Sequence, residues 1–385
     1  MTSTQRTFSC RGCHGSRTTV VLDLGDVPAS DYFPSADDPA TDPAWPLRLV
    51  MCADCALVQL GPAEHPEPEP PTAVESATAL AHAADSAHQV VRDQQLRPGA
   101  TVIEIDSHHG GSWLDGFVAE GLVPVERTGT ADLVVDVHGI AHEPDLNGPI
   151  AAHAARLRQD GRLVLEFHHL LSLVEQSQID TVRHGHWVYL SLICVQRLFH
   201  DHGLVVTRAD TVPVFGGSLR VTAQRAQDNP TVDDSVDQLL DAERAAGLDQ
   251  VDALMALGDR GRKVATALHG HLTEAAEHGR TVAAYGAPSK ATVLLSLAGV
   301  NSALLPYTVD LSPNKHGCRI PGTGVPVRSV EELIAQRPDE IVVLTWDIAP
   351  EIVTQIGAAA DTDWDPDIFV PLPDPGYLAG PRARS

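Results

Sequence analysis

Short apolar runs bounded by Gly, Pro or Asp recur through the middle of the chain. Runs of this length, bounded in this way, are typical of buried strands. The expected strands are 101–106, 122–126, 132–137, 162–167, and an antiparallel-looking pair at 204–208 and 219–223. A glycine-containing turn and a helix-like stretch from Ser112 follow the first run. A strand, a turn and a helix in this order present backbone N–H groups to a cofactor, so the segment predicts a cofactor-binding α/β domain.

The last third of the chain predicts a second α/β unit. Apolar residues recur at helical spacing from 231 to 278. Strands are then expected at 281–285, 307–310 and 340–345, with helices at 291–297 and from Ala349. Strands that alternate with helices in this way indicate a parallel sheet with helices packed on it.

One connection in the middle domain is unusually short. Glu126 ends the second expected strand, at the position where an acid would bind a ribose hydroxyl. Only five residues, 127–131, separate it from Asp132 in the third strand. A parallel crossover that contains a helix needs at least about ten residues. We therefore expect no helix here, and a short or absent wall for an adenine ring.

Composition narrows the class of protein. The chain has 385 residues, 43% of them hydrophobic, and its charge is 27 − 51 = −24. This charge disfavours binding to nucleic acid or to anionic membranes, so we expect neither. The sequence has no long apolar run and no apolar leader near Met1, which predicts a cytoplasmic protein without a membrane span. Lysine is rare and occurs only at Lys263, Lys290 and Lys315.

Two C-x2-C pairs stand at the start of the chain. They are formed by Cys10 with Cys13 and by Cys52 with Cys55. Two such pairs can surround one zinc ion with four thiolates, and this closed coordination predicts a structural role for the metal. The alternative is two disulfides, which a reducing cytoplasm disfavours.

Three domains are expected from these patterns. A Pro- and Glu-rich segment at 62–71 is typical of a linker that follows the zinc-binding module. The expected boundaries are 1–72 for the zinc-binding module, 73–228 for the middle domain and 229–385 for the C-terminal domain with its leading helices. The fold class is therefore α/β with a small zinc module.

Several sequence blocks, taken in order, resemble the three-domain sugar C-methyltransferases of antibiotic deoxysugar pathways. The matching blocks are 10–13, 23–28, 52–60, 141–146, 216–220, 285–290, 313–317, 321–323 and 346–347. The resemblance covers nearly the whole chain. It implies a four-cysteine zinc module, a Rossmann-like domain that binds S-adenosylmethionine, and a C-terminal Rossmann-like domain.

Four departures from the family pattern fall in one functional site. The first glycine of the family's cofactor turn is Asp106 here, whose carboxylate would face the methionine carboxylate of the cofactor. The loop that is tyrosine-rich in the family reads PTAVESAT at 71–78 and has no tyrosine. The family's Y-H-E-H block is R-H-G-H at 183–186, and the region after Glu126 is missing. The middle domain is thus expected to be degenerate, and S-adenosylmethionine is not expected as its cofactor.

The candidate site residues follow from the same blocks. His186 is the expected general base, Arg183 the expected clamp for a carboxylate, sulfate or phosphate, and His184 a further catalytic candidate. Side chains at the strand ends are also expected near this cleft: His108, His109, His168 and His169. The residues expected to bind substrate are Arg220, Ser218, His142, Lys290 and Lys315, which lie in the matching blocks.

Three functions remain open at this point. The first is a methyltransferase-like enzyme that has lost S-adenosylmethionine-dependent methylation and catalyses an intramolecular displacement. Such a chain is similar to the subunits that close aziridine (azabicycle) rings in azinomycin-type pathways, with loss of sulfate or phosphate. The substrate would be a small biosynthetic intermediate, and a small second protein subunit could complete the site. The alternatives are an S-adenosylmethionine-dependent sugar C-methyltransferase and a non-catalytic scaffold.

Overall fold

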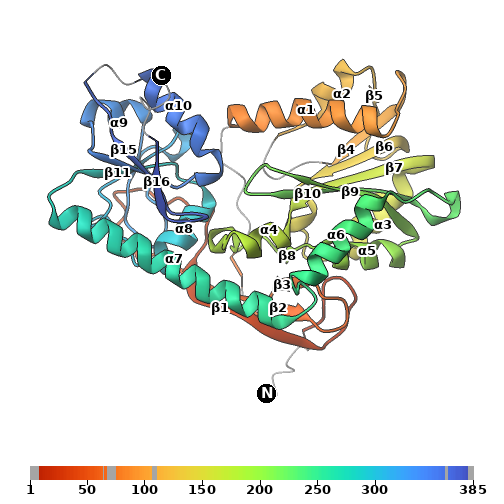
Figure 1. Ribbon diagram of the computed structural model, residues 1–385, viewed down its shortest axis with the longest axis horizontal. Helices are drawn as coiled ribbons and strands as arrows, with labels where there is room; N and C mark the ends of the chain where they lie inside the picture. Colours follow the sequence, from red (N-terminus) through yellow and green to blue (C-terminus); the bar gives the residue numbers. More distant parts are fainter. Residues whose placement is uncertain (1–7, 64, 67–74, 106–110, 360–362, 380–385) are drawn as a thin grey trace.

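The computed structural model describes residues 8–63, 65–66, 75–105, 111–359 and 363–379. Its strands form three sheets, and Figure 1 shows that these lie in three parts of the molecule. The N-terminal sheet lies at the base of the view, the middle domain at the right and the C-terminal domain at the left. The mixed α/β class expected from the sequence is confirmed.

The N-terminal sheet has four strands in the order β1-β2-β3-β8. Its bounds are β1 Thr18–Pro28, β2 Ala44–Cys52, β3 Val58–Leu60 and β8 Val188–Tyr189, and all three pairings are antiparallel. Strand β8 comes from the middle of the chain, directly after the 183–186 block. The N-terminal sheet therefore holds that block in place from one side.

The middle sheet has six strands in the order β5-β4-β6-β7-β10-β9. Its bounds are β4 Thr101–Ile105, β5 Val123–Pro124, β6 Ala131–Val137, β7 Leu157–His168, β9 Leu204–Val212 and β10 Ser218–Arg225. Strands β5, β4, β6 and β7 run parallel, whereas β10 is antiparallel to both β7 and β9. The expected antiparallel pair is confirmed.

The short connection before β6 contains no helix: residues 125–130 are all described and are turn or irregular. Strand β5 pairs only with Thr101 and Val102, the first two residues of β4. Since β5 ends so early, the chain needs only a short return to reach the start of β6, and six residues suffice. The expectation of a missing helix is confirmed.

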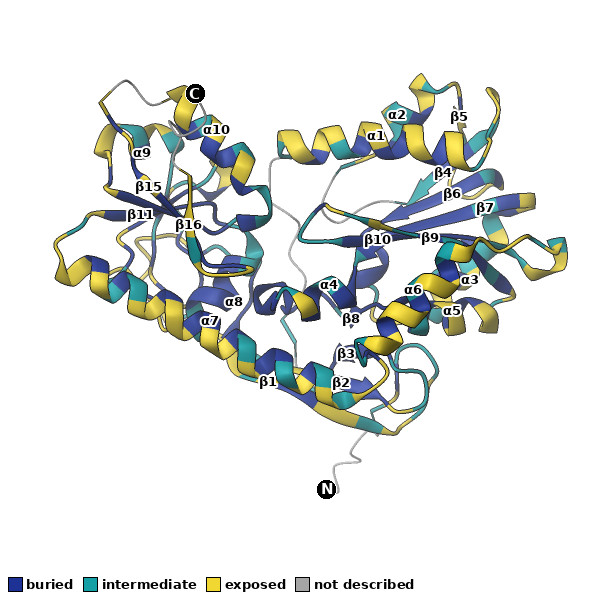
Figure 2. Ribbon diagram, viewed as in Figure 1, coloured by how far each residue is buried: buried dark blue, intermediate teal, exposed yellow. Residues whose placement is uncertain are grey.

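Helices cover both faces of the middle sheet (Figure 1). Their bounds are α1 Ala77–Asp93, α2 Leu114–Ala119, α3 Asn147–Arg156, α4 Leu170–Glu175, α5 Leu192–Asp201 and α6 Asp234–Ala245. Alternate residues of β6 face opposite sides, as the strand period of two requires. Leu133 and Val135 pack under α1 and α2, whereas Val134 packs under α3 and α5. Figure 2 shows strands β6 and β10 buried over most of their length.

The expected helical stretch 231–278 forms two helices. Helix α6 ends at Ala245, and α7 runs from Val251 to Glu277. Gly247, at a positive φ of 73°, turns the chain between them. Glycine adopts this conformation at little cost, which explains the break. Helix α6 packs on β9, whereas α7 packs along β1 and extends to the C-terminal domain (Figure 1).

The C-terminal sheet has the order β13-β12-β11-β14-β15-β16, parallel except for its last strand. Its bounds are β11 Val282–Tyr285, β12 Thr308–Val309, β13 Val327–Arg328, β14 Glu340–Val343, β15 Asp367–Val370 and β16 Gly376–Leu378. The helices are α8 Ser289–Leu297, α9 Val330–Gln336 and α10 Ala349–Ala359. Short 3-10 turns lie at η1 Ile140–His142, η2 Ile179–Thr181, η3 Ala226–Asp228, η4 Pro313–Lys315 and η5 Trp346–Ile348.

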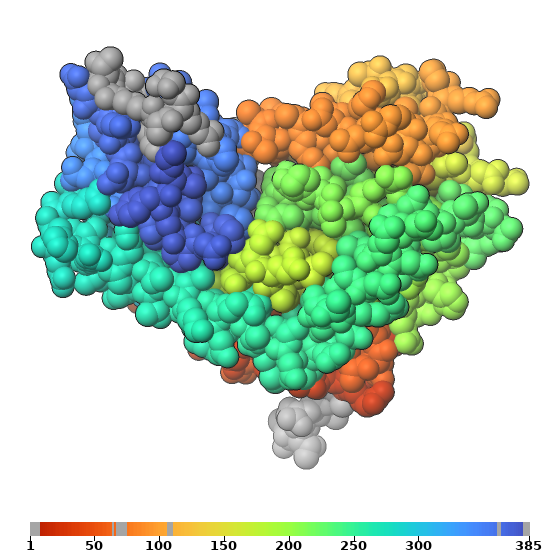
Figure 3. Space-filling view, viewed as in Figure 1, coloured from red at the N-terminus to blue at the C-terminus, as the bar shows by residue number. Residues whose placement is uncertain are grey.

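Helix α1 also touches the C-terminal domain. The Glu351 carboxylate on α10 accepts hydrogen bonds from the backbone N–H of Thr78 at 2.9 Å and from the Thr78 hydroxyl at 2.6 Å. Figure 3 shows the two domains meeting at this point on the front face. No helix among the described residues is both long and apolar enough to cross a membrane.

Candidate functional site

The four cysteines of the N-terminal module converge. Their sulfur atoms all lie within 4.8 Å of one another, with Cys10 Sγ 3.5 Å from Cys55 Sγ and Cys13 Sγ 3.6 Å from Cys52 Sγ. Zinc–sulfur bonds of about 2.3 Å place the sulfurs of a tetrahedral site about 3.8 Å apart. The cluster therefore fits one zinc ion, and all four ligand positions belong to cysteine.

Hydrogen-bond donors lie beside two of the four sulfurs. The Gln59 amide donates to Cys10 Sγ at 3.3 Å, and the Asp54 backbone N–H donates to Cys52 Sγ at 3.4 Å. The hydrogen bond from Cys55 lowers the pKa of Cys10 to about 4, whereas the same bond raises the pKa of Cys55 and burial raises that of Cys52. Donors of this kind usually surround the sulfurs of a thiolate site. A structural zinc module is the role that this closed donor set can serve.

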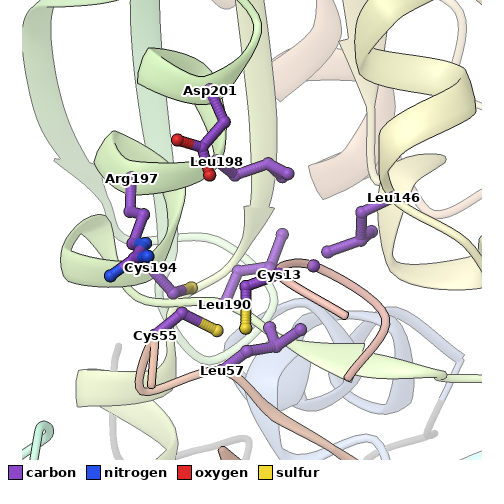
Figure 4. A pocket seen from close by; sticks show the side chains of 10 residues that line it. Cys13, Cys55, Leu57, Leu146, Leu190, Cys194, Arg197, Leu198 and Asp201 are labelled. Carbon is purple, nitrogen blue, oxygen red and sulfur yellow. The ribbon is translucent and has the colours of Figure 1, made fainter. Parts of the chain in front are cut away.

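A fifth cysteine lies beside the module but outside it. Figure 4 shows Cys194, on α5, near Cys13 and Cys55. Its thiol donates to the Ser191 carbonyl at 3.2 Å, and burial raises its pKa to about 12. The space between them measures about 10 Å³, no more than a single water needs. Cys194 is therefore a packed thiol between the module and α5.

The main cavity lies between the middle and C-terminal domains and measures about 270 Å³. It opens at the carboxyl ends of β6 and β7, where ligands bind in α/β sheets of this kind. The start of α1 forms one wall, and the start of α8 together with η5 forms another. Its ionisable lining residues are Glu75, His82, His138, His168, Arg183, His186, Lys290, Lys315 and Asp347.

Five residues expected from the sequence therefore meet in one place: His168, Arg183, His186, Lys290 and Lys315. The others lie elsewhere. His169 is buried against Glu243 at 2.7 Å, and Ser218 donates to the Val214 carbonyl at 3.3 Å. His142 lies next to the cavity, with its ring centroid 4.9 Å from that of His186. His108 and His109 lie outside the described residues.

Arg183 contacts both an acid and the expected base. Its Nη1 donates to Asp31 Oδ2 at 2.8 Å, and its Nη2 contacts His186 Nε2 at 3.0 Å. The Arg183 side chain is only 6% exposed. Arg183 is thus held by an acid of the N-terminal domain, and it reaches the cavity already hydrogen-bonded to the expected base.

The two cavity lysines are also paired with acids. Lys290 forms an ion pair with Asp347 and lies 4.8 Å from the Trp346 ring centroid. Lys315 donates to the Ala287 carbonyl at 2.8 Å and lies 3.7 Å from Asp310 Oδ2. A compact ammonium suits such a buried carbonyl contact better than a planar guanidinium does.

His184 is separated from its two neighbours in the 183–186 block. It packs against Trp45 and His65 on the N-terminal sheet. Burial lowers its pKa to about 4, so the ring stays uncharged near neutral pH. It is absent from the cavity lining, and its environment is that of a core side chain.

Arg220 lies behind the cavity wall in a buried ionic cluster. Its guanidinium pairs with Glu166 at 2.8 Å and stacks 4.9 Å from the Trp113 ring centroid. His82 Nε2 lies 2.6 Å from the other Glu166 oxygen. Despite the cost of burial, the His138 ring at 3.8 Å, the hydrogen bond from His82 and the charge of Arg220 hold the pKa of Glu166 well below its usual range. Arg220 thereby anchors His82, which does line the cavity.

Several site residues were missed from the sequence. His138 directly follows a predicted strand, the position at which side chains reach the carboxyl edge of a sheet, and this signal could have found it. Asp31 and Asp180 carry no such signal, because they reach the site only through contacts with residues distant in sequence. Asp31 bonds Arg183, and Asp180 Oδ2 accepts from Trp346 Nε1 at 2.8 Å.

The expected acid for a cofactor ribose does not reach this site. Glu126 is exposed, follows the two-residue strand β5 and is absent from the cavity lining. Asp106, in the expected cofactor turn, lies outside the described residues. Among the described residues, Glu126 therefore does not line the cavity.

Fold and site together define a methyltransferase-like α/β protein with an N-terminal four-cysteine module. Residues 213–373 match the family described as "C-methyltransferase C-terminal domain", and residues 10–68 match the one described as "Putative zinc binding domain". The chain is 28% identical to C-methyltransferase NovU of Streptomyces niveus, over 96% of each chain.

Solved structures resemble the chain more weakly. The magnesium protoporphyrin IX methyltransferase of Synechocystis PCC 6803 with bound SAH has a TM-score of 0.29 at 16% identity, over 38% of this chain and 84% of that one. The mitomycin 7-O-methyltransferase MmcR has a TM-score of 0.29 at 14% identity, over 39% of this chain and 54% of that one.

Proposed function

We propose that the chain is a methyltransferase-like enzyme that no longer transfers a methyl group and instead catalyses an intramolecular displacement on a small anionic substrate. The substrate carries its own leaving group, a sulfate or phosphate, and its own amine nucleophile. The product is an aziridine ring of the azabicycle type. A small second subunit that completes the site remains part of this proposal.

The set of residues that line the main cavity supports this proposal. Two of the three lysines in the chain line a single cavity together with Arg183 and four histidines. Because the chain as a whole has a charge of −24, this gathering of N–H donors is local. Such donors bind sulfate and phosphate oxygens through charge-assisted hydrogen bonds. The acids Glu75 and Asp347 line the same cavity, but N–H donors outnumber them.

In this reaction the cavity must orient the reacting groups, accept the amine proton and stabilise the departing anion. The amine nitrogen attacks the neighbouring carbon, a C–N bond forms, and the C–O bond to sulfate breaks with its electron pair leaving on the sulfate. His186 takes the amine proton, and Arg183 and Lys290 stabilise the departing anion. Since both reacting groups belong to one molecule, the cavity mainly has to orient them and hold the charge.

A sugar C-methyltransferase is the second candidate, and one observation favours it. The 28% identity to C-methyltransferase NovU extends over 96% of each chain. In that case His186 would serve as the base that activates the sugar carbon. The exposed position of Glu126 and the short β5 count against it.

The direct test uses 2-aminoethyl hydrogen sulfate, a minimal molecule with an amine and a sulfate on adjacent carbons. We expect the protein to release sulfate from it faster than buffer does, as measured by ion chromatography. His186→Asn should lose at least about 100-fold of this rate, the usual minimum for a general base. His88→Asn, which changes an exposed histidine on α1, is the matched control. Equal release by the wild type and by His186→Asn would contradict the assignment of the base.

A further inference from the structure

A carboxylate, a guanidinium and an imidazole form a continuous chain at the edge of the cavity. We propose that Asp31 is a positioning residue that holds Arg183 against His186, and that an oxyanion in the cavity draws Arg183 away and so releases His186 to act as a base. This inference rests on the proposed function, because it assumes that the substrate brings an anionic group.

Asp31 connects all three domains at the site. It follows β1 in the N-terminal part, and its Oδ2 accepts from Arg183 Nη1 of the middle domain at 2.8 Å. Its Oδ1 accepts a hydrogen bond from the hydroxyl of Ser289, which begins α8 and lines the cavity. With one nitrogen of the guanidinium fixed in this way, the plane of the group directs Nη2 toward His186.

Gly185 leaves room for this pair. It has a positive φ of 90°, and a Cβ added there would lie 3.6 Å from Arg183 Nη1 and 3.8 Å from Asp31 Oδ2. A longer side chain would have to pass beside both charged groups. Gly185 therefore lies in ordinary contact with the Asp31–Arg183 pair.

The contact also fixes the state of His186. A guanidinium is protonated at every working pH and can only donate. At 3.0 Å from Arg183 Nη2, His186 Nε2 must therefore accept, and so it carries no proton. While this hydrogen bond lasts, the lone pair of Nε2 is engaged and cannot take a proton from a substrate.

A sulfate or phosphate group changes this balance. Hydrogen bonds to a charged acceptor are roughly twice as strong as those between neutral groups, so an oxyanion competes with the imidazole for Nη2. Asp31 retains Nη1 meanwhile, and the guanidinium turns rather than leaves. Lys290 and Lys315 face the same cavity and add to the attraction. The base is thus set free only when a leaving group is present.

The test combines calorimetric titration of the zinc-loaded protein with inorganic sulfate and 15N NMR of its histidine rings. The His186 Nε2 resonance is assigned by its loss in His186→Asn. Without sulfate we expect the shift of an unprotonated nitrogen that accepts a hydrogen bond. Saturating sulfate should move this resonance, whereas in Arg183→Gln sulfate should leave it in place.

Asp31→Asn tests the positioning role. We expect its Nε2 resonance to differ from wild type before sulfate is added, and the sulfate-induced change to fall by more than half. Asp23→Asn is the matched control, because Asp23 is also an acid on the N-terminal sheet that pairs with an arginine, Arg48 at 2.7 Å. Ser289→Ala, which removes the other contact of Asp31, gives a second variant should Asp31→Asn fold poorly.

Three results would overturn the inference: no sulfate binding, sulfate binding without movement of Nε2, or Asp31→Asn behaving like Asp23→Asn. Failure of the proposed function looks different, because sulfate then moves Nε2 normally while 2-aminoethyl hydrogen sulfate stays intact.

Discussion

Asp180 is a carboxyl group whose surroundings disfavour its ionised form. It lies in η2, is buried, and uses Oδ2 to accept from Trp346. Burial raises its pKa from 3.8 to about 6, partly offset by the charge of Lys290. The native state therefore binds the proton of this group more tightly than the unfolded chain does. Its contribution to stability is full below about pH 4 and is lost as the pH rises through about 6.

Replacing Asp180 by an uncharged residue should remove this loss of stability at higher pH. In Asp180→Asn the amide oxygen can still accept from Trp346, but no charge forms. We expect the free energy of unfolding of the variant, relative to wild type, to rise by roughly 3 kcal/mol between pH 4 and pH 7. Urea denaturation at the two pH values measures it. A difference that stays constant with pH would show that Asp180 is not buried as described.

At the scale of single residues, the sequence predicted which side chains meet in the cavity better than it predicted their hydrogen-bond partners. His186 and Arg183 meet in the cavity as their block predicts, yet their hydrogen bond to each other was not foreseen. Asp31 is 152 positions from Arg183, and no local pattern links the two. His184 shares the same block but faces the N-terminal sheet, because the turn at Gly185 separates it from His186.

Two glycines of helix α7 differ in what packs against them. Gly261 faces η2, where an added Cβ would lie 2.6 Å from Ile179 Cγ1. Gly270 lies on the same helix, and an added Cβ there would meet no atom within 4 Å. Both glycines lower intrinsic helix propensity by a similar amount, so only their surroundings distinguish them.

The two glycines should therefore respond in opposite directions to the same change. Gly270→Ala is expected to raise the free energy of unfolding by about 0.5–1 kcal/mol through helix propensity. Gly261→Ala should lower it by about 1–3 kcal/mol, because the new methyl group forces η2 away from α7. Thermal and urea unfolding of both variants measures this. Stabilisation by both changes would mean that α7 does not approach η2 closely.

Most helices and strands were predictable because local sequence patterns determine them. Buried strands such as β6 and β14 appear as apolar runs, and the missing helix after β5 follows from counting five residues. More than one leading helix was expected before the C-terminal sheet, but the turn at Gly247 was not located, since the apolar period continues across it. Strand β8 was missed because two residues give no period, and it forms only by pairing with β3.

At the scale of the whole molecule, the cavity lies between the middle and C-terminal domains, and the N-terminal part supports it through Asp31. Asp31 reaches Arg183 from the N-terminal part, and Glu351 caps the start of α1 from the C-terminal domain. Strand β5 of the middle sheet is only two residues long, and Glu126 after it is exposed. Under the proposed function, these two features belong to a lost methyl-donor site.

The loss of the methyl donor is the central claim, and calorimetric titration of the zinc-loaded protein with S-adenosylmethionine and S-adenosylhomocysteine tests it most directly. We predict no binding of either compound up to millimolar concentration, while the same sample binds inorganic sulfate. Micromolar binding of S-adenosylmethionine would contradict the account and restore methyl transfer as the function of the cavity.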